Sequence, residues 1–122
     1  MNKEQYSFFK AGSILMAISI ALGAMGAHLL KNTLTPKELE TFHTGVQYQT
    51  IHSLSLIILA ILPSNYNIKW TGVLFLAGIF LFCFGCYSYA LTGVKAFVHI
   101  VPLGGISFIA GWIVLFFQKK KV

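Results

Sequence analysis

The charged residues of this 122-residue chain are confined to narrow bands. Four long segments between these bands contain no Asp, Glu, Lys or Arg: 11–30, 41–68, 70–94 and 96–118. A helix needs roughly 20 predominantly apolar residues to cross a hydrocarbon core of about 30 Å. Each segment is long enough for one crossing, so the spacing predicts a single transmembrane domain over 1–122.

The predicted fold is all-α, an integral membrane four-helix bundle. Its spans are expected at about 11–30, 42–62, 70–91 and 98–117. The segment Thr35-Pro36-Lys37-Glu38 has the form of a capping box, which places the start of the second helix near Pro36, before it enters the membrane. Pro102 is expected to bend the fourth helix or to mark its start.

The composition favours a membrane protein and argues against several soluble classes. Only 10% of the residues are charged, against about a quarter in soluble domains. The net charge of +6 comes from Lys without any Arg, so the bidentate phosphate-binding fork of a nucleic-acid-binding surface is missing. We therefore expect no nucleic-acid partner and take the lipid bilayer as the environment. The first apolar segment is longer than a usual signal-peptide core and is expected to be a retained span.

The lysines also predict an orientation, because cytoplasmic loops carry an excess of Lys and Arg. With four spans, one side of the membrane carries six lysines and the other carries three: Lys3, Lys10, Lys69, Lys119, Lys120 and Lys121 against Lys31, Lys37 and Lys95. Both termini are therefore predicted to be cytoplasmic, in a multi-pass protein of the cell membrane.

Small residues form regular patterns on three of the predicted helices. The first helix carries two stripes, called here the Ala17 stripe (Ser13, Ala17, Ala21, Ala24 and His28) and the Gly12 stripe (Gly12, Ser19, Gly23 and Gly26). Further glycines, predicted to support close helix packing, are Gly78 and Gly85 on the third helix and Gly104, Gly105 and Gly111 on the fourth. Two stripes predict two neighbours for the first helix. Some stripes could instead serve contacts between subunits of a homo-oligomer.

Polar residues inside the spans gather on one face of the second helix. Tyr48, Gln49, His52 and Ser53 lie there, with His52 about halfway through the bilayer. His28, at the end of the first span, is expected to join Gln49 and His52 in a polar core that links the first two helices.

Three interpretations of His52 remain open at this stage. It could hydrogen-bond across helices and fix their register, with each such bond contributing about 0.5–2 kcal/mol. It could titrate in a proton or ion path, as in a small transporter or channel. It could also ligate a metal or haem together with other histidines, although no HxxxH or HxxH spacing supports this.

No pattern in the sequence indicates catalysis. Cys83-Phe84-Gly85-Cys86 has CxxC spacing, but it lies inside a predicted span without a nearby charge, so we interpret both cysteines as small packing residues. No nucleophile–base pair, phosphate-binding loop or carboxylate pair is visible. We predict no enzymatic activity, no cofactor and no metal site.

Several segments together resemble a family of small four-span membrane proteins. They are Gly23 to His28, Tyr48-Gln49 with His52, Tyr87 to Gly93, Pro102 to Gly105, and Gly111-Trp112, in that order. The chain is similar over about 11–117 to domain-of-unknown-function family 423, which is related to eukaryotic transmembrane protein 256.

The resemblance implies a membrane protein without established enzymatic activity that supports envelope integrity. It marks eleven positions: Gly23, Gly26, His28, Tyr48, Gln49, His52, Pro102, Gly104, Gly105, Gly111 and Trp112. Around Cys83 to Gly85 the family more often has Ser-Gly-Ser, which weakens a redox role for the cysteines. A structural or interaction role, with other membrane proteins among the partners, is the leading hypothesis. The alternative is a small transporter or channel that uses the polar face around Gln49 and His52, and a third hypothesis is a module that binds lipid or another membrane protein through the basic cytoplasmic rim.

Overall fold

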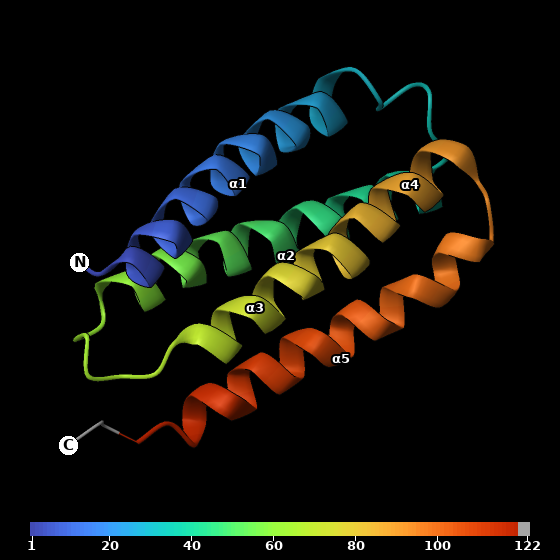
Figure 1. Cartoon of the computed structure of the whole chain (residues 1–122). Helices are drawn as coiled ribbons and strands as arrows, with labels where there is room; N and C mark the ends of the chain where they lie inside the picture. The colour runs from blue at the N-terminus through green and yellow to red at the C-terminus, as the bar shows by residue number, and fades with distance from the viewer. Residues whose placement is uncertain (120–122) are drawn as a thin grey trace.

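Four antiparallel helical rods make up the computed structural model, which describes residues 1–119 (Figure 1). The rods are α1 (Lys3–His28), α2 (Pro36–Ile61), a third rod made of α3 (Lys69–Gly78), a π-helical turn η1 (Ile79–Cys83) and α4 (Phe84–Thr92), and α5 (Ala96–Phe116). Residues 1–119 contain no strand. The all-α prediction is confirmed. The N-terminus, the 62–68 connection and the end of α5 lie at one end of the molecule, and the other two connections lie at the opposite end.

Helix α1 begins eight residues before the predicted span. The Oδ1 atom of Asn2 accepts the backbone N–H of Gln5 at 2.8 Å, and the Gln5 side chain accepts the backbone N–H of Asn2 at 2.9 Å. This reciprocal capping box satisfies two N–H groups that a helix start otherwise leaves without a partner. The charged first turns therefore belong to the same helix as the apolar segment.

The predicted start of the second helix is confirmed. Thr35 is the N-cap of α2, its Oγ1 accepts the Glu38 N–H at 3.2 Å, and a Glu38 carboxylate oxygen accepts the Thr35 N–H at 2.8 Å. The hydrogen bonds from the Thr35 backbone and side chain favour the charged form of the Glu38 carboxyl, and they hold its pKa below the ordinary value.

Two features of the other rods differ from the prediction. The π turn from Ile79 to Cys83, in which the Phe84 N–H bonds to the Ile79 carbonyl, had no sequence signal. Helix α5 begins at Ala96 and continues through Pro102, so a helix start at Pro102 was wrong.

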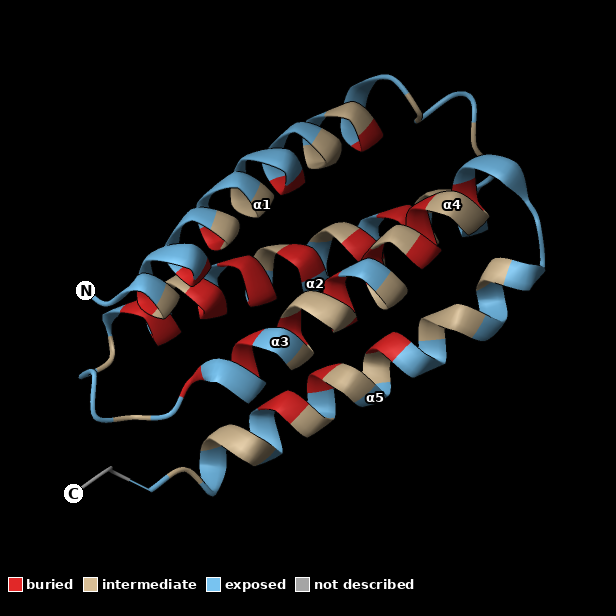
Figure 2. Ribbon diagram, viewed as in Figure 1, coloured by how far each residue is buried: buried red, intermediate tan, exposed pale blue. Residues whose placement is uncertain are grey.

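The buried residues are concentrated on α2 and on the third rod, which are the two inner rods (Figure 2). Helix α2 packs against α1 on one side and against the third rod on the other, and α5 packs mainly against the third rod. Three helical segments are long and apolar enough to cross a membrane: Lys3–His28, Lys69–Thr92 and Ala96–Phe116. Helix α2 is as long as α1 but falls outside this group, because its polar residues lower its mean hydropathy.

The two stripes of α1 have different environments. In the Gly12 stripe, Gly12, Ser19 and Gly26 are buried against α2. All five residues of the Ala17 stripe are exposed, so the prediction that each stripe contacts a neighbouring helix was wrong for this one within a single chain. Near its start, α1 also reaches the third rod through the ring of Phe8, which fills the space at Gly72.

The predicted packing glycines also differ in how tightly they are enclosed. A Cβ atom at Gly104 would collide with the backbone of Phe82, and one at Gly78 would collide with the ring of Phe108. At Gly85 and Gly111 a Cβ atom would lie 2.9 Å from Val101 Cγ2 and 2.7 Å from Phe75 Cε1, respectively. At Gly105 the nearest atom would be 3.7 Å away, so this glycine is not required by close packing.

Candidate functional site

Gln49 joins three of the four rods at the middle of α2. Its Nε2 donates to the Leu15 carbonyl of α1 at 2.8 Å, and its Oε1 accepts the hydroxyl of Tyr87 from α4 at 2.6 Å. The Gln49 side chain is fully buried and Tyr87 is 7% exposed. Buried polar groups are costly unless they are paired, and here both ends of the amide have a partner.

Two glycines create the space for these contacts. Gly45 lies one turn before Gln49 on the same face of α2, and a Cβ atom there would lie 2.7 Å from Tyr87 Cε1. On the other side, a Cβ atom at Gly12 of α1 would lie 2.7 Å from the Ser53 carbonyl oxygen. The small residues thus allow α1 and α4 to approach α2 closely enough for hydrogen bonds.

His52 has a hydrogen-bond partner at each ring nitrogen. Its Nδ1 lies 2.8 Å from the Tyr48 carbonyl oxygen, and its Nε2 accepts the indole N–H of Trp112 from α5 at 3.1 Å. A carbonyl oxygen only accepts and an indole N–H only donates, so Nδ1 must carry the hydrogen and Nε2 must be bare. The two contacts therefore define a neutral imidazole in the Nδ1–H tautomer.

Aromatic rings surround the same imidazole. The Phe108 ring stacks on His52 with a centroid distance of 3.6 Å, and the Phe75 ring meets it edge-on at 5.1 Å. His52 itself is 2% exposed. A second proton on His52 would place an N–H against the Trp112 N–H in a water-poor environment, so the geometry suits a fixed neutral side chain.

Other polar side chains add bonds between the rods. Thr50 donates to the Ser19 hydroxyl at 3.1 Å, Ser107 donates to the Leu74 carbonyl at 2.7 Å, and Gln5 donates to the Leu62 carbonyl at 2.7 Å. The Gln5 bond satisfies a carbonyl at the end of α2. We call Gln49, Tyr87, His52 and Trp112 the polar core, because their bonds hold α1, α4 and α5 to α2.

The remaining predicted residues lie in different places. Tyr48 is 38% exposed and contributes its carbonyl to His52, while its ring packs on Phe82 with a centroid distance of 4.7 Å. Ser53 is fully buried, and its hydroxyl lacks a hydrogen-bond partner within the described chain.

His28 does not join the polar core. It is exposed at the end of α1, whereas His52 binds α5, so the prediction that His28, Gln49 and His52 together link the first two helices was wrong. Of these three residues, Gln49 is the one that bonds to the other helix. The error arose because helix phase places residues on a face but does not identify the helix that the face meets.

Both cysteines are buried, with Cys83 in η1 and Cys86 in α4. Their environment agrees with the interpretation as packing residues. Within residues 1–119, no three His, Cys, Asp or Glu side chains gather closely enough to hold a metal ion.

Sequence reasoning missed the partners of the polar core. Tyr87 and Trp112 were noticed as parts of a resemblance but not as partners of Gln49 and His52. A weak signal existed, because a buried Tyr hydroxyl or Trp indole N–H usually finds a hydrogen-bond partner.

The fold and the polar core define the class of protein. Apolar side chains cover the outside of a helical molecule whose polar side chains bond to each other inside, which is the arrangement of a helical membrane protein. The family model described as "Protein of unknown function (DUF423)" matches residues 22–105. This chain belongs to that family.

Relatives agree with this assignment. The chain is 37% identical to the UPF0382 membrane protein YwdK of Bacillus subtilis, over 93% of this chain and 96% of that protein. It is 34% identical to the UPF0382 membrane protein SH2409 of Staphylococcus haemolyticus, over 93% and 95%. The UPF0382 inner membrane protein YgdD of Escherichia coli is 37% identical over 78% of this chain and 75% of its own length. No solved structure matches the chain.

Proposed function

We propose that this protein is a non-catalytic structural protein of the cell membrane, in which all four rods cross the bilayer and the polar core fixes their register. The observation that carries the proposal is the double pairing of Gln49 and of His52. Their hydrogen-bonding atoms are engaged with other rods or with the backbone, which favours a role in holding helices together. Support of membrane integrity is the cellular part of the proposal and rests on the family resemblance.

The placement of α2 in the bilayer is part of the proposal. Its buried polar residues Gln49, His52 and Ser53 face the other rods. Its outward face carries Leu54, Ile58 and Ile61, which are 51%, 49% and 68% exposed. An inward polar face with an outward apolar face suits a span surrounded by lipid. Four spans and the lysine distribution favour cytoplasmic termini, although Lys120 and Lys121 of that count lie outside the described residues. Reporter fusions at Val122 and in the Thr33 loop would test this orientation.

The central experiment compares His52→Leu with the parent protein. If His52 is structural, the variant should melt at lower temperature in detergent. In a deletion strain it should restore resistance to membrane stress only in part, and the shortfall should match the decrease in melting temperature. Unchanged melting combined with complete loss of the cellular phenotype would contradict a structural role. Leu54→Ile, on the outward face of the same helix, is the control for expression and insertion.

A further variant, His52→Ala, separates this proposal from a transporter or channel. A proteoliposome flux that depends on pH and disappears in His52→Ala, while the folded state persists, could not be explained by packing. The proposal expects equal background flux in the parent protein and in this variant.

A further inference from the structure

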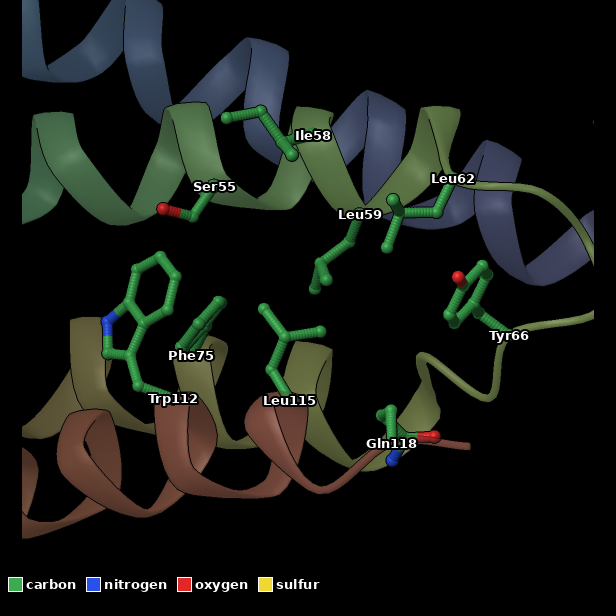
Figure 3. A pocket seen from close by; sticks show the side chains of 9 residues that line it. All are labelled: Ser55, Ile58, Leu59, Leu62, Tyr66, Phe75, Trp112, Leu115 and Gln118. Carbon is green, nitrogen blue, oxygen red and sulfur yellow. The ribbon is translucent and has the colours of Figure 1, made fainter. Parts of the chain in front are cut away.

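An elongated crevice lies between α2 and α5, beside the polar core (Figure 3). It has a volume of about 330 Å³ and mostly apolar walls. The lining residues on its two long sides are Ser55, Ile58, Leu59 and Leu62 from α2, and Trp112, Leu115 and Gln118 from α5 and its end. Phe75 and Tyr66 complete it from the third rod and the connection before it.

The crevice runs from the end of the molecule where the N-terminus lies toward the middle of the bundle. Ser55 and Leu62 lie seven residues apart on α2, which corresponds to about 10 Å along a helix. Tyr66 and Gln118 lie at its outer end, and Ser55 and Trp112 lie at its inner end. The crevice is therefore long and narrow, and it follows the last two turns of α2.

Its side opens at the outer surface of the molecule. Ile58 and Trp112, on opposite walls, are 49% and 43% exposed, whereas Leu59 and Phe75 behind them are almost completely buried. The indole of Trp112 is held by its bond to His52, and that bond fixes the inner wall. An acyl chain could enter sideways without leaving the hydrocarbon.

Positive charge lies at the outer end of the crevice. Lys69 begins α3 three residues after Tyr66, and Lys119 directly follows Gln118. This end of the molecule carries four lysines and one glutamate among the described residues: Lys3, Lys10, Lys69, Lys119 and Glu4. The opposite end carries three lysines and two glutamates: Lys31, Lys37, Lys95, Glu38 and Glu40. The charge is thus concentrated where a lipid headgroup would lie.

We propose that the crevice binds one anionic phospholipid of the leaflet at the terminal end of the bundle. An acyl chain lies along Leu59, Phe75 and Leu115, and the phosphate headgroup lies between Lys69 and Lys119. Basic pockets between membrane helices favour anionic headgroups in this way. The inference rests on the four-span insertion proposed above, since α2 supplies one wall.

The experiment uses Trp112 as a fluorescent reporter. The chain has two tryptophans, so Trp70→Phe leaves Trp112, which lines the crevice, as the single emitter. The full-length variant is reconstituted in mixed phosphatidylcholine and phosphatidylglycerol vesicles in which one of the two lipids carries dibrominated acyl chains. Quenching as a function of bromolipid fraction gives the relative association constant of each lipid at the crevice.

The expected result is stronger quenching by brominated phosphatidylglycerol than by brominated phosphatidylcholine. Lys69→Gln and Lys119→Gln, each in the single-tryptophan protein, should each lower the preference about fivefold, because a lysine near an anionic surface contributes about that factor. Lys31→Gln and Lys95→Gln, at the opposite end, are the matched controls and should leave it unchanged.

A second variant tests the crevice itself. Ser55→Phe places a ring in the inner end and should reduce quenching by both lipids at Trp112, whereas Ile106→Phe, on the exposed face of α5, should not. If Ser55→Phe does not fold, the two lysine variants still decide the question.

Each other outcome contradicts a specific part of the inference. Equal quenching by both lipids would refute anionic selectivity and leave the four-span insertion intact. Quenching by neither lipid at any protein dilution would refute the insertion of this region in the bilayer. Quenching that is absent at a high protein-to-lipid ratio and appears only on dilution in lipid would show that a second copy of the chain covers the crevice. It would refute lipid as the occupant.

Discussion

Helices α2 and α5 reverse the relation between polarity and burial that soluble proteins follow. Helix α2 falls short of the apolarity of a membrane span, yet it has nine buried residues, including Gln49, His52 and Ser53. Helix α5 is strongly apolar, but only Gly104, Phe108 and Gly111 are buried. In lipid, apolar surface gains little from leaving its solvent, whereas a polar group gains from finding a partner inside the protein. The comparison teaches that, of these two helices, the more polar one is the more deeply buried.

The largest change in stability is expected where α5 packs against the third rod. Gly104→Ala should lower the free energy of unfolding by about 3 kcal/mol, because the new Cβ atom meets the Phe82 backbone rather than a flexible side chain. The adjacent Gly105→Ala is the control, because its Cβ atom has room, and it should be neutral or slightly stabilising. Thermal melting in one detergent measures both. Equal losses would show that α5 is not held by close backbone packing.

The next effect concerns the polar residues of α2. Gln49→Leu should cost about 2 kcal/mol, because it leaves the buried Tyr87 hydroxyl without its acceptor. Tyr87→Phe in the same background should then cost little more, so the double variant should be less destabilised than the sum of the two single variants. A double-mutant cycle of melting temperatures measures this coupling. Additive losses would mean that the two side chains do not act as a pair.

Two smaller substitutions compare the loss of stability at a buried position and at an exposed position. Ile79→Val, at a fully buried position of the third rod, should cost about 1 kcal/mol. Ile109→Val, at a position of α5 that is 62% exposed, should change stability by less than about 0.5 kcal/mol. Chemical unfolding in mixed micelles would compare them. A larger loss at Ile109 would place that face of α5 in a protein contact.

The smallest effect is expected at the start of α2. The pKa of Glu38 is lower in the folded protein than its ordinary value of 4.5, so its contribution to stability is present above that pH and is lost as the pH falls through the folded value. Glu38→Gln should keep the cap geometry and remove this pH dependence. Melting temperatures between about pH 3 and 6 would check this prediction, with Glu40→Gln as the control.

Much of the fold could be predicted from charge spacing and helix caps. The gaps without charge located the rods to within a few residues, except at α1, where the Asn2–Gln5 capping box extended the helix toward the N-terminus. The π turn from Ile79 to Cys83 could not be predicted, because none of its residues has a distinctive local preference for it. Its place beside Gly104 depends on how α5 approaches the third rod.

The candidate site was predicted in part. Gln49 and His52 were identified as buried polar residues of one helix face, but their partners Leu15, Tyr87 and Trp112 were not. Hydrogen-bond partners 34 to 60 residues apart depend on the relative rotation and depth of separate helices. The spacing of residues in the sequence shows only which face of one helix they share, and it does not give the rotation or depth of one helix relative to another.

The amino-acid sequence by itself determined the solvent of this protein, its helical class and the face of α2 on which the polar residues lie. These properties follow from local composition and from the geometry of a single helix. Only the tertiary structure decided that Gln49 binds α1 and α4, that His52 is a neutral acceptor for Trp112, and that His28 lies outside the polar core. The physical reason is that hydrogen bonding and close packing are short-ranged, so partners are fixed only when separate helices meet at one depth and rotation.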